Sequence, residues 1–403
     1  MRKICLIGLF AFVLAATAAA EDLQVNSYTL GNQLYPQIAA LDDGFIVVWR
    51  SSLFSGDPDD AIVGRRLDST GQPVSADFQI SGVGTESDLR EPSVAALGSG
   101  AFVVTWIDTS VILRARLFDS AGSAISGVLT LADIARDPDL AAVGASDFAV
   151  VWYEGTMSGD AVQVQRYDST GTAVGAMERA DTSSGDLSRT HIASRGSGEF
   201  VVTWRSSGVG SVGRLFDSSG SPVAAELDLG TDGSPGPVAM RDDGSFLLTL
   251  AANPDVGVGA DIKARLFDSL GAPLATEVTV NTFVAGYQGF PEVATKDDGF
   301  AVVWRSTASD ATDSSGFSVH YRDIGPSAEL AGGSFQLNSY TTSDQESPAV
   351  AVGGDGQVVV VWSSNGSPGS DAGRAILSTT SFDNIFTDGF ESGDTASWSS
   401  TLP

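Results

Sequence analysis

Apolar residues occur in short runs along most of the chain, separated by turns rich in Gly, Asp and Ser. One such run is FIVVW, from Phe45 to Trp49. In an extended chain Phe45, Val47 and Trp49 point to one side, and the residues between them point to the other. Both sides are apolar, so the pattern predicts a strand that is covered on both faces.

This run belongs to a repeated unit. Each copy begins with a strand of the Pro-x-Val-Ala type, passes through a Gly turn, and continues into a strand similar to Phe-x-Val-Val-Trp. The tryptophans of the copies are Trp49, Trp106, Trp152, Trp204, Trp304 and Trp362. Leu250 takes the place of Trp in one further copy, so successive copies are 46 to 58 residues apart. A regular spacing of this kind is typical of repeat architectures.

A second pair of strands follows in each copy, as in LFDSSGSPV from Leu215 to Val223. In the first copy we expect the four strands near Ile38, at Phe45 to Trp49, at Ile62 to Leu67 and at Val74 to Ile80. One four-stranded sheet cannot bury both of its faces, whereas sheets arranged around an axis can. The seven copies therefore predict an all-β protein, a seven-bladed β-propeller of four-stranded blades.

The two ends of the repeated region complement each other. The segment QVNSYT from Gln24 nearly repeats QLNSYT from Gln336, which is the fourth strand of the sixth unit. The seventh unit ends after Leu377 without a fourth strand of its own. We therefore expect Leu23 to Tyr28 to complete the last blade and close the ring, which removes exposed sheet edges. The alternative, an open solenoid of stacked sheets, leaves the N-terminal strand unexplained.

The unit resembles the Asp-Gly-Phe-Val-Val-Val-Trp repeats of large secreted and surface proteins of bacteria, over roughly residues 23 to 380. This resemblance implies a propeller-like fold and specifies no activity. The segment Phe386 to Ser399, FTDGFESGDTASWS, looks like a short C-terminal extension found on secreted proteins of Gram-negative bacteria.

The N-terminus has the pattern of an export signal. Arg2 and Lys3 precede an uncharged stretch that ends in the small residues Ala18 and Ala20. We expect a signal peptide at 1–20, the propeller at 21–382 and a tail at 383–403. The mature protein is then exported to the periplasm, the cell surface or the medium.

The chain is strongly acidic, with 50 Asp and Glu against 22 Lys and Arg. Removing Arg2 and Lys3 with the signal leaves 20 basic residues against 50 acidic ones, a formal net charge of −30. Such a surface repels phosphate backbones, so nucleic acid is excluded as a partner. No other apolar stretch reaches the roughly 20 residues of a membrane span, so no membrane insertion is expected. The only cysteine, Cys5, lies in the signal, so thiol chemistry is not expected.

Turn lengths distinguish the two faces of the predicted disc. The first-to-second and third-to-fourth strand turns are tight, as at Asp42 to Gly44 and in the DSxG turns. The other connections are long and irregular, as at Ser51 to Asp60 and Ser81 to Arg90. They emerge together on the opposite face, so we expect a ligand site there, near the central channel. Drift of unconstrained loops is the alternative explanation.

Candidate site residues lie on these long connections. The candidates for ligand binding are three tyrosines, expected to be exposed, and one arginine: Tyr28, Tyr287, Tyr340 and Arg90. The candidate ligands for Ca²⁺, which prefers carboxylate oxygens, are Asp57, Asp59, Asp60, Asp310 and Asp313. These loops lack the alternating Asp spacing of a calcium loop, so solvated surface charge is the alternative.

Arg recurs in the third strand of the unit. Its positions are Arg65, Arg116, Arg214 and Arg265, with Gln165 and His320 assigned to the matching places. A ring of anion-binding groups is one interpretation. Repetition favours the other, in which each Arg pairs with a turn carboxylate of its own or a neighbouring blade. His191, beside Ile192 in a first strand, is interpreted as a hydrogen-bonded blade histidine.

The sequence contains no nucleophile elbow, zinc-binding His-Glu-x-x-His or phosphate-binding Gly loop. We therefore predict a secreted, non-catalytic propeller that acts as a binding or scaffolding module for a glycan or an extracellular protein. The alternative is a secreted polysaccharide hydrolase or lyase that uses loop carboxylates, which requires an acidic pair in a pocket of the long-loop face. A third possibility is a structural envelope protein without such a pocket.

Overall fold

The structure, a computed structural model, describes residues 22–56, 60–82, 89–156, 159–182, 185–230, 233–252, 260–307, 316–366 and 373–380. The expected signal peptide and tail lie outside these residues and stay predictions, as does export. The described residues form 28 strands and two short 3₁₀ helices, η1 (Phe54–Gly56) and η2 (Gly98–Gly100). Among them, no helix is long and apolar enough to cross a membrane.

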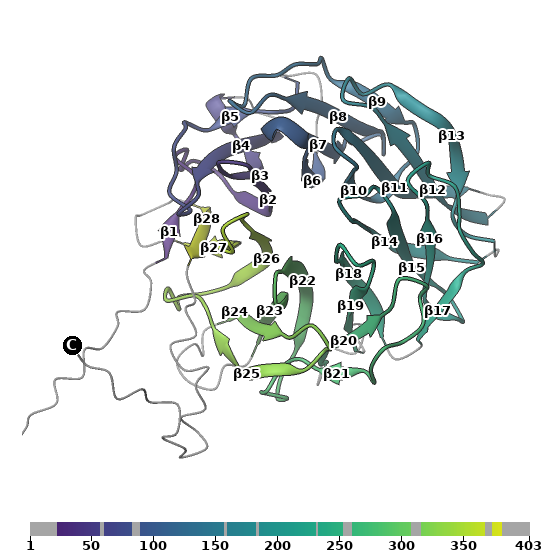
Figure 1. The fold of residues 1–403 in the computed structure, drawn as a ribbon. Helices are drawn as coiled ribbons and strands as arrows, with labels where there is room; N and C mark the ends of the chain where they lie inside the picture. Colours follow the sequence, from purple (N-terminus) through teal and green to yellow (C-terminus); the bar gives the residue numbers. More distant parts are fainter. Residues whose placement is uncertain are drawn as a thin grey trace, which may run out of the picture.

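The described strands form seven four-stranded antiparallel sheets, the blades, arranged in a ring (Figure 1). Blades 1 to 3 consist of β2 (Gln33–Leu41), β3 (Gly44–Ser52), β4 (Asp60–Asp68), β5 (Phe78–Gln79); β6 (Arg90–Ala96), β7 (Phe102–Ile107), β8 (Leu113–Phe118), β9 (Leu129–Ala132); and β10 (Arg136–Val143), β11 (Asp147–Thr156), β12 (Gly159–Tyr167), β13 (Ala173–Arg179). Blades 4 and 5 consist of β14 (Leu187–Ser194), β15 (Phe200–Ser206), β16 (Gly210–Phe216), β17 (Leu227–Gly230); and β18 (Ser234–Met240), β19 (Phe246–Ala251), β20 (Ile262–Phe267), β21 (Val278–Thr279). Blades 6 and 7 consist of β22 (Gln288–Lys296), β23 (Gly299–Ser306), β24 (Ser318–Ile324), β25 (Leu330–Gln336); and β26 (Gln345–Val352), β27 (Val358–Asn365), β28 (Arg374–Thr380), β1 (Leu23–Gln24).

The predicted seven-bladed propeller is confirmed. In each blade the first strand lies nearest the central channel and the later ones follow outward (Figure 1). The fourth strand of blade 1 is shorter than predicted, since β5 covers only Phe78–Gln79. Before it, the Ser75 hydroxyl accepts the backbone N–H of Arg66 at 3.0 Å, so a polar side chain takes the place of a ladder bond.

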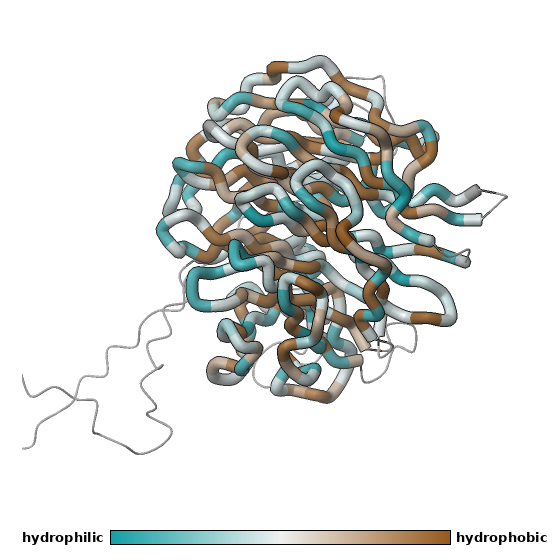
Figure 2. Tube along the Cα trace, turned by 45° about the vertical axis from the view of Figure 1, so that its right-hand side comes forward, coloured by the Kyte–Doolittle hydropathy of each residue, from teal (hydrophilic) through white to brown (hydrophobic). Residues whose placement is uncertain are grey.

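The hydrophobic core lies between neighbouring blades. Phe45, Val47 and Trp49 of β3 pack in one cluster with residues of blade 7, including Val361. Ile46 and Val48 of the same strand pack in another cluster with residues of blade 2. The prediction of a strand covered on both faces is therefore confirmed, and the brown apolar segments of Figure 2 follow these strands through the ring.

The repeated tryptophans are core residues. Each is at most 1% exposed, and Leu250 fills the equivalent place in blade 5 with 1% exposure. The tight turns use their aspartates as predicted: Asp217, for example, accepts the backbone N–H groups of Ser219 and Ser221 at 2.8 and 3.0 Å.

The N-terminal segment closes the ring. β1 pairs with β28, and Val25 extends the ladder by donating to the carbonyl of Ile376 at 2.7 Å. The carboxylate of Asp22, just before β1, accepts the backbone N–H groups of Ser339 and Tyr340 in the connection between blades 6 and 7. The carboxylate of Asp77, just before β5, accepts those of Ser27 and Tyr28 in the same way. β1 is therefore the fourth strand of blade 7, as predicted.

The recurring arginine joins neighbouring blades through backbone carbonyls. Arg116 donates to the carbonyl of Ile80 in blade 1 at 3.0 Å and to that of Ser126 in its own blade at 3.3 Å. Equivalent bonds across the blade boundary run from Arg65, Arg214, Arg265 and Arg322 to the carbonyls of Val25, Ala180, Leu229 and Val280. Arg65 also lies 3.6 Å from the carboxylate of Asp77 in its own blade, so the predicted carboxylate partner is found for Arg65. The contact that recurs across the blade boundaries is made to a backbone carbonyl instead. Each of these carbonyls lies at or just beyond the end of a fourth strand, where the ladder ends and a buried carbonyl needs another donor.

The match proposed for blade 6 also needs correction. Arg322 pairs opposite Val302, as Arg116 pairs opposite Val104. His320 lies opposite Trp304, two residues away. It is buried, and its Nε2 lies 3.0 Å from the Ser318 hydroxyl. The equivalent position was assigned two residues too early because the third strand of this unit lacks the usual Arg-Leu-Phe ending.

Candidate functional site

Every innermost strand carries a register shift near its start, between Leu34 and Gln37 in β2 and at matching places in the others. The shifted residue precedes a proline, or Thr190 in blade 4. Its φ lies between 44° and 55° in six blades, at Tyr35, Glu91, Asp137, Arg189, Phe290 and Ser347. A left-handed φ costs a non-glycine residue about 1–2 kcal/mol, so the surrounding sheet holds the backbone in this conformation.

The bulges define two positions per blade at the channel. We call the bulged residues the rim: Tyr35, Glu91, Asp137, Arg189, Gly236, Phe290 and Ser347. We call the residues two positions later the floor: Gln37, Ser93, Asp139, His191, Val238, Glu292 and Ala349. The rest of the unit repeats closely, whereas the rim and floor residues differ from blade to blade. Each blade therefore places a rim and a floor residue at the same points of the channel, and the type of side chain at these points differs between blades.

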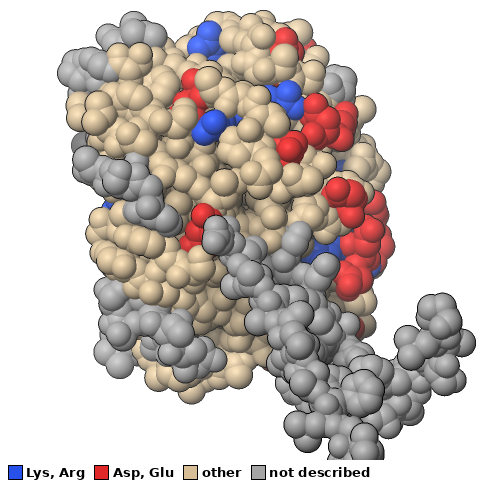
Figure 3. Space-filling model, turned by 90° about the vertical axis from the view of Figure 1, so that its left-hand side faces the viewer, with Lys and Arg blue, Asp and Glu red and all other residues tan. Residues whose placement is uncertain are grey.

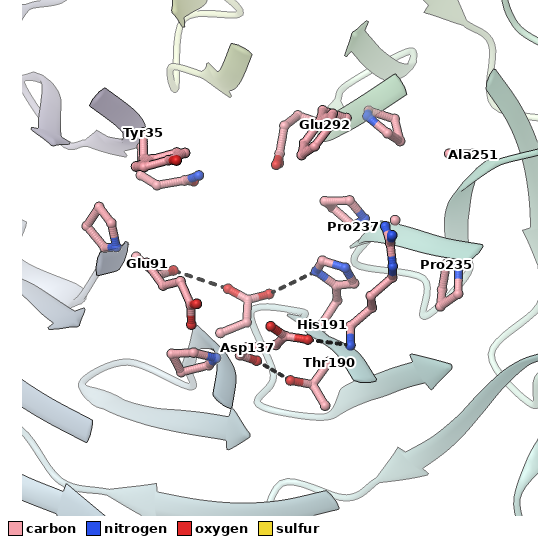
Figure 4. Close-up of a pocket in the computed structure, with 18 of the residues that line it drawn as sticks. Tyr35, Glu91, Asp137, Thr190, His191, Pro235, Pro237, Ala251 and Glu292 are labelled. Carbon is pink, nitrogen blue, oxygen red and sulfur yellow. Dashed lines mark hydrogen bonds and ion pairs between the residues drawn. The ribbon is translucent and has the colours of Figure 1, made fainter. Parts of the chain in front are cut away.

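A cavity of about 1040 Å³ lies at this end of the channel (Figure 4). Rim residues of blades 1 to 6 line it, together with five floor residues: Gln37, Ser93, Asp139, His191 and Glu292. The innermost strands begin on the long-loop face, so the cavity lies on the face predicted for a ligand. A second cavity, of about 500 Å³, lies among the tight turns of the opposite face, beside Arg241 and Lys296.

The rim has two chemically different halves. The aromatic rings of Tyr35 and Phe290, which are 48% and 54% exposed, belong to blades 1 and 6 and flank blade 7. Glu91, Asp137 and Arg189 come from the consecutive blades 2, 3 and 4. Figure 4 shows Tyr35 on one side of the cavity and Asp137 on the other. A ligand in this mouth meets apolar rings on one side and charged groups on the other.

Asp139 is the most firmly oriented group of the floor. Its Oδ1 accepts hydrogen bonds from the backbone N–H of Leu140 at 2.8 Å and from the Ser93 hydroxyl at 3.1 Å. Its Oδ2 accepts the backbone N–H of Ile192 at 3.1 Å and lies 3.8 Å from His191 Nδ1. His191 therefore stands inside the cavity beside a carboxylate, rather than within the blade as predicted.

Glu292, in blade 6, stands across the ring from Asp139 in blade 3. Burial and, secondarily, the negative charge of Asp139 raise the pKa of Glu292 well above its ordinary value, which favours the neutral acid. Within the described part of the chain, the Glu292 carboxyl has no hydrogen-bond or ion-pair partner. Figure 4 shows it directed into the cavity. An unpartnered carboxyl in such a place is a candidate for ligand binding or proton transfer.

Glu91 and Asp137 form a second pair of neighbouring carboxyls, on the rim. Burial raises the pKa of Glu91, and the charge of Asp137 adds to the effect. The positive charges of Arg90 and Arg136 and a backbone hydrogen bond from Asp137 act in the opposite direction. Unlike Glu292, Glu91 therefore has nearby positive charges and a hydrogen bond that favour its ionised form.

Two arginines of the cavity wall are engaged in contacts with other side chains. The Arg305 guanidinium lies 4.1 Å from the ring centroid of Phe290 and 4.2 Å from that of Phe317, and pairs with Glu346 at 3.1 Å. Arg50 Nε donates to Asp60 at 3.1 Å. Asp60, a predicted calcium ligand, is therefore already neutralised by an arginine.

The other predicted calcium ligands, Asp57, Asp59, Asp310 and Asp313, lie outside the described residues. Within the described part, no group of three or more His, Cys, Asp or Glu side chains is arranged to hold a metal ion. Calcium binding by these loops stays a prediction.

The structure brings together only some of the predicted ligand-binding residues. Tyr287 and Arg90 line the cavity, whereas Tyr28 and Tyr340 are not among its lining residues. The three tyrosines are partly buried rather than exposed. Tyr28, for instance, packs edge-on against Phe54, with ring centroids 5.2 Å apart. The connections between units fold back onto the blades, so their aromatic residues cover the sheet edges.

The rim and most of the floor were not predicted from the sequence. Glu91, Asp137, Asp139 and Glu292 belong to innermost strands, whereas carboxylates were sought on loops. The available signal was the residue before the recurring proline, which varies while its neighbours repeat. No feature of the neighbouring sequence indicated that a bulge would direct this residue into the channel.

No protein-family model matches the chain, and comparison with curated proteins found no match in sequence. Solved structures are similar in fold. A protein of unknown function from Dyadobacter fermentans matches with a TM-score of 0.51 and 13% identity, over 77% of this chain and 96% of its own. The endosialidase of phage phi92 matches with a TM-score of 0.53 and 10% identity, over 90% of this chain and 69% of its own. Raptor from Chaetomium thermophilum matches with a TM-score of 0.53 and 13% identity, over 90% of this chain and 30% of its own. At these identities the likeness concerns the fold alone, which is that of a β-propeller.

Proposed function

We propose that the protein is an exported binding module whose central cavity binds a saccharide. The observation that carries this proposal is the divided rim. One position, repeated in every blade, presents exposed aromatic rings at Tyr35 and Phe290, and charged groups at Glu91, Asp137 and Arg189. Pockets that select a small ligand combine apolar walls with a few directed polar groups.

A sugar ring matches this division, since it presents C–H groups on its faces and hydroxyls around its edge. The aromatic rings provide flat apolar contact area, and the carboxylates and the guanidinium provide acceptors and donors for hydroxyls. The cavity volume of about 1040 Å³ accommodates a short oligosaccharide. The presence of this cavity also disfavours a purely structural protein, for which no pocket on this face was expected.

A saccharide panel tests the proposal with the purified protein. We expect one class of glycan to bind, and Tyr35→Gly and Phe290→Gly to weaken binding at least roughly tenfold, because each removes an apolar contact surface. Leu270→Ser is the matched control, since Leu270 is a 75%-exposed apolar residue in a tight turn of the opposite face. Binding that survives both rim substitutions, or no binding across the panel, would contradict the proposal.

Glu292 and Asp139 favour a second candidate function, hydrolysis of a glycosidic bond. A neutral carboxylic acid and a carboxylate on opposite sides of a bound sugar are the groups that this reaction uses. Glu292 would protonate the leaving oxygen, and Asp139 would accept a proton from the attacking water. Release of reducing ends from the bound glycan, abolished in Glu292→Gln, is the expected result. A glycan that binds and stays intact in long incubations would exclude this candidate and leave the binding function standing.

A further inference from the structure

The residues defined above as the floor include two carboxyls, Asp139 and Glu292, and no Lys or Arg. Burial and the charge of Asp139 both oppose ionisation of Glu292, and no hydrogen bond or ion pair from the described chain relieves them. Arg50 and Arg305, which line the cavity, are paired with Asp60 and Glu346. A carboxyl in this state gains most from a cation that arrives with the ligand.

We propose that the saccharide bound in the cavity carries a free primary amine, whose ammonium group binds at Glu292, on the cavity floor that Glu292 shares with Asp139. This inference rests on the proposed function and specifies its ligand class. An ammonium group has three N–H donors and no acceptor. Glu292 supplies the acceptor, and the negative charge of Asp139, which acts on Glu292 across the same cavity, adds to the attraction.

Binding of the ammonium exchanges one positive charge for another. Glu292 gives up its proton to the solvent, and the ligand's ammonium takes the place of that proton at the Glu292 carboxylate. The resulting charge-assisted hydrogen bonds are stronger than bonds to a neutral acid. An acetylated amine cannot make this exchange, because an amide carries no charge and offers one N–H.

The surrounding titratable groups determine the pH range of the exchange. Those that line the cavity with Glu292 or lie on the packed strands are Asp139, His191, Glu91, Asp137, Arg50, Arg90, Arg189, Tyr35, Tyr287, Arg305 and Glu346. The neighbouring β18 contributes no titratable side chain. Among these groups, His191 stands beside Asp139, with its Nδ1 3.8 Å from the Asp139 carboxylate. The measurements are therefore made at more than one pH.

Two oligosaccharides of equal length test the inference: β-1,4-linked glucosamine and its N-acetylated counterpart. Titration calorimetry at mildly acidic pH, in two buffers of different ionisation enthalpy, reports affinity and proton exchange together. We expect the amine form to bind at least roughly tenfold more tightly and to release up to one proton per binding event. Glu292→Gln should lose the proton release and roughly tenfold in affinity for the amine form.

Non-specific attraction needs a control, because acidic side chains gather along the right-hand side of the view in Figure 3. Asp298→Asn removes a carboxylate whose side chain is 82% exposed, in a tight turn of the opposite face. It should leave both the affinity and the proton release unchanged, whereas added salt should weaken any non-specific component in all variants alike.

Each outcome separates the inference from the proposed function. Equal affinity for the two oligosaccharides, or amine binding without proton release, overturns the inference and leaves saccharide binding intact. The same holds if both probes fail while a neutral glycan of the panel binds in the cavity. If no saccharide binds at all, the proposed function and the inference fall together.

Discussion

Ring closure by the N-terminal segment depends on Asn26, whose contribution to stability can be worked out from the structure. Its Oδ1 accepts the backbone N–H of Ile376 at 2.8 Å, and its Nδ2 donates to the carbonyl of Tyr28 at 2.9 Å. Asn26 is 3% exposed and Ile376 is fully buried. Asn26→Ala removes two hydrogen bonds and leaves a buried N–H without that acceptor. The expected loss in the free energy of unfolding is about 2–4 kcal/mol.

Asn338 in blade 6 is a matched reference. Its Oδ1 accepts the N–H of Val319 at 2.8 Å, its Nδ2 donates to the carbonyl of Tyr340 at 3.0 Å, and it is also 3% exposed. If β1 is an ordinary fourth strand, Asn338→Ala and Asn26→Ala should lower the urea midpoint equally. The fluorescence of the buried tryptophans reports the transition. An unchanged midpoint for Asn26→Ala beside a lowered one for Asn338→Ala would refute closure of the ring by this segment.

Three further predictions concern the blade boundaries and the cavity. Arg322→Met should lower the free energy of unfolding by about 2–4 kcal/mol, because it leaves the carbonyls of Val280 and Gly332 without their charged donor; an unchanged urea midpoint would argue against the role of this arginine. Glu292→Gln should stabilise the protein at neutral pH, because burial raises the pKa of Glu292 and the wild-type stability declines as pH rises through that value. The gain should vanish below the ordinary pKa of 4.5, and thermal melts over a pH series check both the sign and the range. Tyr35→Gly should keep or raise the melting temperature, because glycine accepts the φ of 54° without strain; a large drop would show that the ring of Tyr35 holds the fold together.

The number of blades, the order of their strands and the closure of the ring were predictable from the sequence. Each depends on a local pattern: alternation along Phe45 to Trp49, Asp-Ser-x-Gly turns, and the near repeat of QVNSYT and QLNSYT. Alternation with period two and turn chemistry involve residues within a few positions of one another. Because the same pattern recurs in seven units, the sequence predicts the fold even though each local pattern is weak. A single unit would not be stable alone, since each repeat depends on its neighbours.

The partners of the recurring arginine and the composition of the cavity depended on the tertiary structure. Arg116 bonds to a carbonyl 36 residues away across a blade boundary, which no pattern within one unit reveals. The cavity collects one or two side chains from each of six strands, and their positions depend on a bulge that the surrounding sheet imposes. Glu292 and Asp139 lie 153 positions apart in the sequence and interact only because the ring brings blades 3 and 6 to opposite sides of one channel. Local physics therefore determined the blades, and only closure of the ring decided which of their residues share a site.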